Sequence, residues 1–402
     1  MAELRERRPV EDWATDFDHF DPAFTADRYP IYEELRSRCP VARSERYGGL
    51  EVFTRWADVQ AVAHDPETFS SRRIIVSEVP TSHPGMPLPP INIDPPEHTA
   101  KRRIMLPYFN PVATQRWARP IRDICARLLD GLEGRTSCDL AVDYAQCVPA
   151  ELTAQMLGVP IGDAPMFRSW MHDLLEVGPV DIELLKRTTE TMMDYMRQLL
   201  ERRRAGEGAG GIDLVSYLLE QRPDGEPIPD DELVKMLFLL LVAGVDTTWS
   251  AIGSAMLHLA THPEDRHRLA ADPSLVPTAV EEFLRAYNPV VIARVATRDT
   301  EVGGCPIAGG DWVMMAYDAA NRDPDVFERA DEVVLDRERN RHVGFGLGVH
   351  RCLGSNLARL EMNIAIESWM QRFPEFSLTD PDEVVFSAGQ VRGPRRIPVR
   401  LG

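Results

Sequence analysis

The sequence predicts a mainly α fold with small β sheets, and three observations support this prediction. Apolar residues repeat with helical spacing through most of the chain from about Thr99 onward. One stretch, from Pro229 to about His262, is apolar all round its middle and indicates a long helix through the centre of the molecule. Strand-like runs are short and lie mainly toward the two ends, at Gly48–Phe53, Asp311–Ala316 and Ile397–Leu401. We expect one domain over residues 1–402.

Three predicted helices organise the chain. The central helix is expected to begin with Asp230 as its N-cap, and at 1.5 Å per residue it would be roughly 50 Å long. A second helix is predicted over Leu275–Tyr287, with one apolar face and with Glu282 and Arg285 three residues apart on another face. A third helix is predicted directly after Cys352.

Charge and hydropathy limit the possible partners and compartment. The 402 residues carry a net charge of −18, which argues against nucleic acid as a general partner. The N-terminal segment has no apolar core and matches neither a signal peptide nor a membrane anchor. The longest apolar stretch, Met236–Val245, is well short of the roughly 20 residues that span a bilayer. We therefore expect a soluble, cytoplasmic protein without a membrane anchor.

The cysteines are scattered and lack the paired spacing of zinc sites or disulfide frameworks. Reduced thiols of this kind fit a cytosolic protein. The six cysteines are Cys39, Cys125, Cys138, Cys147, Cys305 and Cys352.

Cys352 differs from the others because it lies in the glycine-rich segment Phe345–Gly354, FGLGVHRCLG, just before a predicted helix. A helix N-terminus favours thiolate over thiol. Gly348 and Gly354 allow the backbone to approach the sulfur or a bound group closely, and Phe345 can shield the sulfur from water. From these residues alone, the alternative is a glycine-rich loop around a buried cysteine.

This segment resembles the haem-binding loop of the cytochrome P450 family, and the resemblance extends in order from about Pro30 to Pro398, with the soluble bacterial type as the best match. It implies a cytochrome P450 fold with a long central helix across the haem. It also implies haem b held non-covalently apart from a bond between Cys352 and the iron. The loop residues expected to contact the haem are Phe345, Gly346, His350, Cys352 and Gly354.

Residues 243–248, AGVDTT, resemble the family's oxygen-activation segment. The resemblance implies that Ala243 and Gly244 leave room for O2, that Thr247 hydrogen-bonds it and that Asp246 admits protons from solvent. On the residues alone, a packing notch of small side chains with one buried acid remains an alternative.

Two further motifs match the family. His98 and Arg102 lie four residues apart on one helical face, and with Arg294 and His350 they resemble the residues that hold the haem propionates. Glu282 and Arg285 resemble the ExxR pair, whose implied role is structural, in a buried ion network with a loop around Asn321–Arg339.

The substrate pocket is implied only by resemblance, and its residues are mostly apolar. It draws on segments at Ile74–Ile93, Phe167–Leu175 and Ser387–Val391. Arg72 and Arg73 either pair with a substrate carboxylate or are structural or solvent-facing, and we favour the second role. The individual pocket candidates are Leu239, Val242, Val290, Val291, Ile292 and Val391.

No flavin or iron–sulfur domain follows Cys352 in these residues, so electrons are expected from a ferredoxin and ferredoxin reductase pair. Leu335–Arg359 has a local excess of positive charge, which would attract an acidic ferredoxin. The expected activity is a haem-thiolate monooxygenase that hydroxylates, or oxidises in another way, including O- or N-dealkylation, a small to medium apolar substrate. A peroxide-driven or isomerising haem-thiolate enzyme and a haem-based gas sensor are the alternatives. The Asp246–Thr247 pair argues against the first, and the lack of a signalling domain in this sequence argues against the second.

Overall fold

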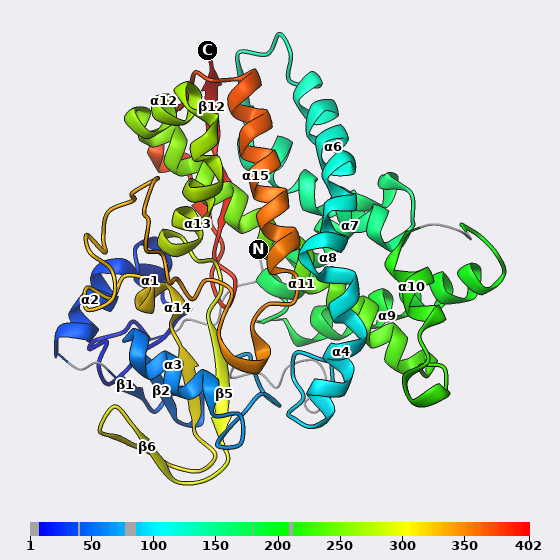
Figure 1. Cartoon of the computed structure of the whole chain (residues 1–402). Coiled ribbons are helices and arrows are strands. Elements are labelled where there is room, and N and C mark those ends of the chain that lie inside the picture. Colours follow the sequence, from blue (N-terminus) through cyan, green and yellow to red (C-terminus); the bar gives the residue numbers. More distant parts are fainter. Residues whose placement is uncertain (1–7, 39–40, 77–85, 180, 209–211) are drawn as a thin grey trace.

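The computed structural model describes residues 8–38, 41–76, 86–179, 181–208 and 212–402. Cys39 and part of the implied pocket segment Ile74–Ile93 lie outside these residues. The described chain is predominantly helical, with small sheets that lie in separate parts of the molecule (Figure 1). The predicted fold class is therefore confirmed.

The helices occupy most of the chain from residue 97 onward, as predicted, and three more precede that point. Their bounds are α1 Pro22–Ala26, α2 Tyr29–Arg38, α3 Trp56–His64, α4 Glu97–Phe109, α5 Pro111–Thr114, α6 Ala118–Asp130, α7 Cys147–Leu157, α8 Ala164–His172, α9 Ile182–Arg204, α10 Leu214–Glu220, α11 Asp230–Thr261, α12 Pro263–Ala271, α13 Val276–Ala286, α14 Tyr317–Ala320 and α15 Ser355–Arg372. A π-helical turn, Asp173–Val177, continues directly from α8.

The largest sheet joins residues that are far apart in the sequence. Its strand order is β1-β2-β8-β5-β3, and β2 pairs in parallel with β8 while the other neighbours are antiparallel. Smaller sheets are β4-β12-β9, β6-β7 and β10-β11. The bounds are β1 Val41–Ser44, β2 Leu50–Phe53, β3 Phe69–Ser70, β4 Ser137–Asp139, β5 Ile292–Ala296, β6 Thr300–Val302, β7 Cys305–Ile307, β8 Trp312–Met315, β9 Phe376–Leu378, β10 Val385–Phe386, β11 Pro394–Arg396 and β12 Pro398–Leu401.

Helix α11 crosses the middle of the fold and packs against α7, α9 and α15 (Figure 1). Asp230 is its first residue rather than its N-cap. Pro229 occupies the cap position without a side-chain hydrogen bond, and the Asp230 carboxylate pairs with Arg204 on α9. Among the described helices, α11 alone has the length and hydropathy of a membrane span, and 67% of its most apolar window is buried inside the fold. It is therefore accounted for as the core helix of a folded domain.

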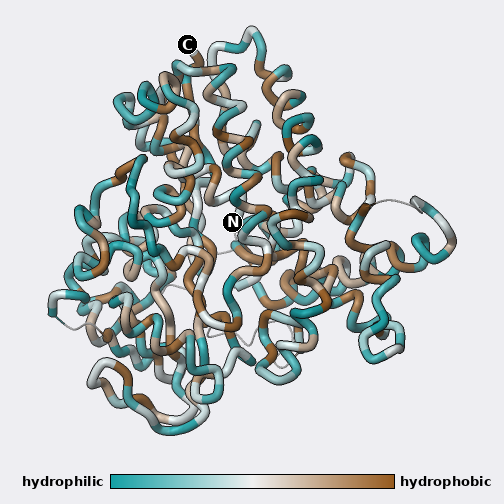
Figure 2. The backbone as a smooth tube through the Cα atoms, in the orientation of Figure 1, coloured by the Kyte–Doolittle hydropathy of each residue, from teal (hydrophilic) through white to brown (hydrophobic). Residues whose placement is uncertain are grey.

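The helices carry alternating hydrophilic and hydrophobic bands (Figure 2), as expected of helices that pack one face on a core. The main core lies among α6, α7, α9, α11, α13 and α15. Two smaller cores cover the two faces of the largest sheet. The cysteine segment lies where the helical core meets the sheet, because the Cys352 loop contacts α3 on one side and continues into α15 on the other.

Candidate active site

The loop around Cys352 is fixed by backbone contacts at both ends. The Cys352 N–H donates a 2.7 Å hydrogen bond to the Phe345 carbonyl, which closes the loop. Gly348 has a φ of +64°, and a Cβ at this position would lie 2.0 Å from the Ala63 carbonyl oxygen at the end of α3. Gly348 therefore allows close approach to α3, rather than to the sulfur as the sequence suggested. Helix α15 begins at Ser355, so Cys352 lies just before the helix and not within its first turn.

The Cys352 side chain is accessible although protein surrounds it, so the sulfur faces a hollow inside the molecule. Burial raises the pKa of the Cys352 thiol, while the Gly354 N–H and nearby arginines, Arg102 among them, offset part of that rise. The sequence predicted that the helix start would favour the thiolate, whereas in the structure burial has the larger effect and favours the thiol. A coordinated metal ion deprotonates a thiol outright and would supply the difference.

Four basic side chains meet beside this loop, as the sequence predicted. The rings of His98 on α4 and His350 lie 4.1 Å apart between centroids. Arg102, one turn along α4, donates a 2.5 Å hydrogen bond to the Arg351 carbonyl, and Arg294 of β5 is buried. Burial and mutual repulsion lower the pKa of His98, and they lower that of His350 to about 2.

This basic cluster lacks counter-charges. Within the described ranges, none of His98, Arg102, Arg294 and His350 has a carboxylate within 4.0 Å, and both ring nitrogens of His98 and Nε2 of His350 are buried without a hydrogen-bond partner. Buried donors are normally satisfied. The cluster is therefore suited to an anionic group, and two propionates of a haem fit this chemistry.

On α11, the structure brings Ala243 and Thr247 to one face. Ala243 is exposed and Thr247 partly exposed in the middle of an otherwise buried helix, so this turn borders an internal hollow. Thr247 Oγ1 donates a 2.7 Å hydrogen bond to the Ala243 carbonyl. Gly244 differs from the expectation, because a Cβ there would lie 3.7 Å from Thr153 Oγ1 on α7, so Gly244 faces α7.

Asp246 is 1% exposed and points away from this hollow toward strand β11. Its Oδ1 lies 2.8 Å from Nη2 of Arg395, whose Nε lies 2.6 Å from Oε1 of Glu176. Burial raises the Asp246 pKa to about 6, against the opposing effect of Arg395. Sequence reasoning missed Arg395 and Glu176, because both are ordinary charged residues far from the oxygen-activation segment along the chain.

The Glu282–Arg285 pair is completely buried and forms the network that the sequence predicted. Arg285 contacts both carboxylate oxygens of Glu282 at 2.8 Å and donates to the carbonyls of Asn321, Ala330 and Glu332. Arg337 also pairs with Glu282, at 2.9 Å. The predicted loop around Asn321–Arg339 is therefore the segment that this pair holds.

Five of the six implied substrate-pocket residues are partly exposed, and one is buried. Leu239 and Val242 are partly exposed on α11, and Val290 forms a β-bridge with Val391. Val291 is buried in the core beside the largest sheet, because successive side chains along an extended segment point to opposite faces. Val291 is thus a core residue, while Ile292 on β5 is partly exposed.

Arg72 and Arg73 lie at the surface. Arg72 Nε is 3.5 Å from Asp94, and the Arg73 guanidinium stacks on the Trp312 ring at 4.5 Å. These contacts support the structural or solvent-facing role that we favoured.

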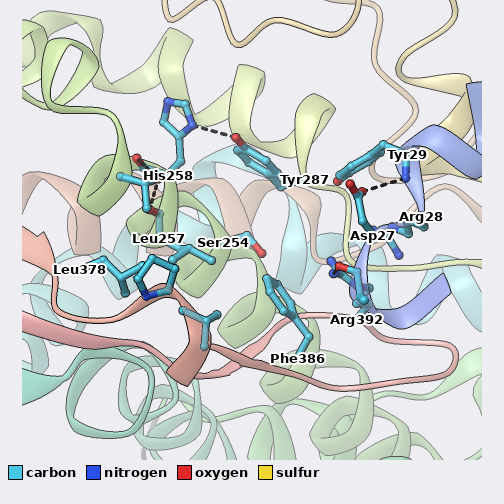
Figure 3. A pocket seen from close by; sticks show the side chains of 14 residues that line it. Asp27, Arg28, Tyr29, Ser254, Leu257, His258, Tyr287, Leu378, Phe386 and Arg392 are labelled. Carbon is cyan, nitrogen blue, oxygen red and sulfur yellow. Dashed lines mark hydrogen bonds between the residues drawn. The ribbon is translucent and has the colours of Figure 1, made fainter. Parts of the chain in front are cut away.

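A separate cavity of about 350 Å³ lies between α2, the C-terminal half of α11 and strand β10. Figure 3 shows His258 bonded to Tyr287 at one side of it and Phe386 beside Arg392 at another. The His258 Nδ1 to Tyr287 Oη distance is 2.7 Å, and His258 Nε2 lies 2.8 Å from Asp265. None of the site residues predicted from the sequence lines this cavity.

A cysteine loop before a helix, a basic cluster without counter-charges and a central helix with an accessible turn define a haem-thiolate monooxygenase, and sequence comparison agrees. The family model Cytochrome P450 matches residues 52–394. The chain belongs to the cytochrome P450 family, whose members are haem-thiolate monooxygenases.

Individual relatives match nearly the whole chain. Cytochrome P450 107B1 of Saccharopolyspora erythraea is 33% identical, over 95% of this chain and 97% of its own length. Vitamin D(3) 25-hydroxylase of Pseudonocardia autotrophica is 36% identical, over 96% of each. The solved structure of the bacillaene polyketide synthase cytochrome P450 PksS from Bacillus subtilis 168 superposes with a TM-score of 0.87 at 29% identity, over 96% of this chain and 100% of that one.

Proposed function

We propose that this protein is a cytoplasmic, single-domain monooxygenase over residues 1–402 that oxidises a small to medium apolar organic substrate with electrons from a ferredoxin and its reductase. The observation that carries the proposal is the basic cluster of His98, Arg102, Arg294 and His350 beside the inward-facing Cys352. Family membership supplies the reaction class, and the substrate, the electron donor and the residue roles are our inference.

The described residues fit a non-covalently held haem b. Cys352 would be its protein ligand, and in the described chain no group of three or more His, Cys, Asp or Glu side chains could hold a metal ion by itself. The basic cluster would hold the propionates through charge-assisted hydrogen bonds. Phe345, Gly346 and Gly354 would enclose the sulfur side, with Ala243 of α11 on the opposite side, while Gly244 faces α7. When bound, the haem activates dioxygen.

Thr247 and Asp246 would manage the protons that this reaction consumes. The Thr247 hydroxyl, held against the Ala243 carbonyl, lies at the accessible turn of α11 and can relay a proton there. Asp246 lies on the buried side of the same helix, and with a pKa of about 6 it both accepts and releases protons near neutral pH.

An apolar substrate is favoured by the character of the implied pocket residues, of which Leu239 and Val242 lie on α11. Leu239, Val242, Val290, Ile292 and Val391 are apolar and partly exposed. A relative that is 36% identical carries the name Vitamin D(3) 25-hydroxylase, and vitamin D(3) is an apolar compound. Burial of such a ligand would gain roughly 25 cal/mol per Å² of apolar surface.

A ferredoxin would dock over the cysteine loop. Several basic residues around this loop are neutralised, since Arg337, Arg359, Lys101 and Arg122 all pair with carboxylates. The docking surface is therefore smaller than the sequence suggested. It comprises the exposed residues Arg103, Arg339, Arg341 and Arg351, none of which has a carboxylate within 4.0 Å among the described residues, with Leu106 and Val349 as exposed apolar side chains. A basic rim around apolar contacts suits a small acidic protein.

The test is turnover with isotopically labelled dioxygen, a ferredoxin and its reductase, against a panel of apolar compounds. We expect one labelled oxygen atom in the oxidised product and dependence on the reduced ferredoxin. Product formed only with added peroxide, and without the label, would favour the peroxide-driven alternative. A carbon monoxide complex that lacks the thiolate spectrum would remove the haem-thiolate assignment altogether.

A further inference from the structure

Three charged side chains from three elements form a continuous chain behind the accessible turn of α11. Glu176, on the π-helical turn after α8, contacts Arg395 Nε at 2.6 Å, and Arg395 Nη2 contacts Asp246 at 2.8 Å. The side chains of Arg395, Glu176 and Asp246 are 11%, 18% and 1% exposed, respectively. The charges therefore interact in a weakly screened environment.

Arg395 is held in one position by uncharged contacts as well. Its Nη1 donates to Ser250 Oγ at 2.9 Å, and its guanidinium lies 4.2 Å from the centre of the Trp249 ring. A Cβ on Gly393 would lie 2.3 Å from the Ser250 side chain, so only glycine allows β11 to run this close to α11. The close approach of the strand places the guanidinium between the two carboxylates.

The two neighbours act on Asp246 in opposite directions. Burial is the largest effect and raises the Asp246 pKa, Arg395 lowers it, and Glu176 raises it. Arg395 and Glu176 are the charged groups that act on Asp246 from the elements packed around it in the described structure. Among the described contacts, His172 on α8 meets this network at Glu176, with Nδ1 3.4 Å from Oε2.

We propose that Arg395 and Glu176 are positioning residues that together set the charge of Asp246, with Arg395 favouring the carboxylate and Glu176 limiting that effect by sharing the guanidinium. Asp246 then changes its protonation within the working pH range instead of remaining ionised. The inference deepens the proposed function and rests on it, because the proton role of Asp246 is part of that proposal.

The experiment is an infrared titration of the protonated Asp246 carboxyl group in the holoenzyme, with the band assigned by its loss in Asp246→Asn. Glu176→Gln leaves Arg395 wholly to Asp246 and should lower the titration midpoint, by about one pH unit. Arg395→Gln removes the favourable charge and should raise the midpoint by a similar amount. Asp173→Asn, which removes a negative charge from the same turn without contacting Arg395, should leave the midpoint unchanged.

Opposite shifts in the two variants would support the inference, since a purely structural contact gives no reason for opposite signs. Shifts in one direction, or no shift, would overturn it. If Arg395→Gln does not fold, Glu176→Gln decides alone, because loss of the Glu176 charge and of its hold on Arg395 both favour the Asp246 carboxylate and predict a downward shift, whereas a purely structural contact predicts none. The pH profile of product formation is measured in parallel. Infrared shifts without a matching change in that profile would leave the positioning role intact and refute the proton role of Asp246.

Discussion

Thr247 donates its hydroxyl hydrogen to the carbonyl of Ala243, one turn earlier on α11, at 2.7 Å. Because that carbonyl can also bond the peptide N–H of the next turn, the hydroxyl is held locally and still lies at the accessible face of the helix. Thr247→Ala removes this donor with little change of volume. We expect substrate binding to persist and oxygen consumption to continue, with more peroxide and several-fold less product for each electron pair. Product and peroxide measured per electron donor consumed test this, and unchanged coupling would reduce the segment to a packing notch.

Asp246→Asn should make stability less dependent on pH. The Asp246 pKa rises from 3.8 to about 6 on folding, so protonation favours the folded state. Stability from this group is complete below about pH 4 and is lost as pH rises through about 6, by at most about 3 kcal/mol. The melting temperature of Asp246→Asn relative to the parent protein should therefore rise between pH 4 and 8. A constant difference across that range would mean that Asp246 does not titrate as described.

Cys352→Ser should abolish the thiolate spectrum of the haem and the monooxygenase activity, because a hydroxyl is a poor soft ligand. Cys125→Ser and Cys138→Ser are the controls, since both thiols are buried and burial raises their pKa to about 11 and 12. The spectrum of the reduced carbon monoxide complex is the measurement. Loss of the thiolate spectrum in a control, with its retention in Cys352→Ser, would reassign the ligand.

Glu282→Gln should destabilise the fold strongly, because it leaves Arg285 and Arg337 without their buried counter-charge. A loss of about 3–5 kcal/mol in unfolding free energy is expected. Asp194→Asn is the matched control, since it breaks an exposed i,i+3 pair with Arg197 and should cost under about 0.5 kcal/mol. Denaturant unfolding of both variants measures the difference. Equal losses would mean that the buried pair is not the structural centre of the Asn321–Arg339 loop.

Arg103→Glu and Arg341→Glu should slow electron transfer from ferredoxin without changing substrate affinity, and added salt should have the same effect. Arg400→Glu is the control. Arg400 is exposed on β12, which pairs with β9 after the end of α15, whereas the cysteine loop precedes the start of that roughly 27 Å helix. Stopped-flow reduction measures the rates. Reduction rates that change neither with added salt nor with either charge reversal, Arg103→Glu or Arg341→Glu, would exclude this docking surface.

Local sequence patterns were enough to predict the long helix and the helix that carries Glu282 and Arg285, and the family resemblance implied the loop that this pair holds. Periodicity and motif spacing report contacts within a helix or a short loop. They also placed His98 and Arg102 on one helical face, although only the fold could bring Arg294 of β5 to them.

The errors and omissions have physical causes. Val290 and Val291 are both apolar and adjacent in an extended segment, where successive side chains point to opposite faces. Only the fold shows that Val291 is the one that enters the core. Arg395 could not be linked to Asp246, since a β11 arginine carries no periodic signal and its placement depends on the close approach at Gly393. The charge on the cysteine-loop face was overestimated, because ion pairing depends on distances that the sequence does not contain.

The parallel pairing of β2 with β8 means that, during synthesis, β2 emerges long before the strand with which it pairs. Leu50 pairs with Trp312, 262 residues later in the chain. At about 5–20 residues per second, β2 is complete roughly 13–50 s before its partner strand exists. During that interval the edge of the β1–β2 hairpin has no neighbour and can pair with other chains. Slow translation late in the gene should therefore increase aggregation, and a chaperone that covers the N-terminal hairpin should reduce it.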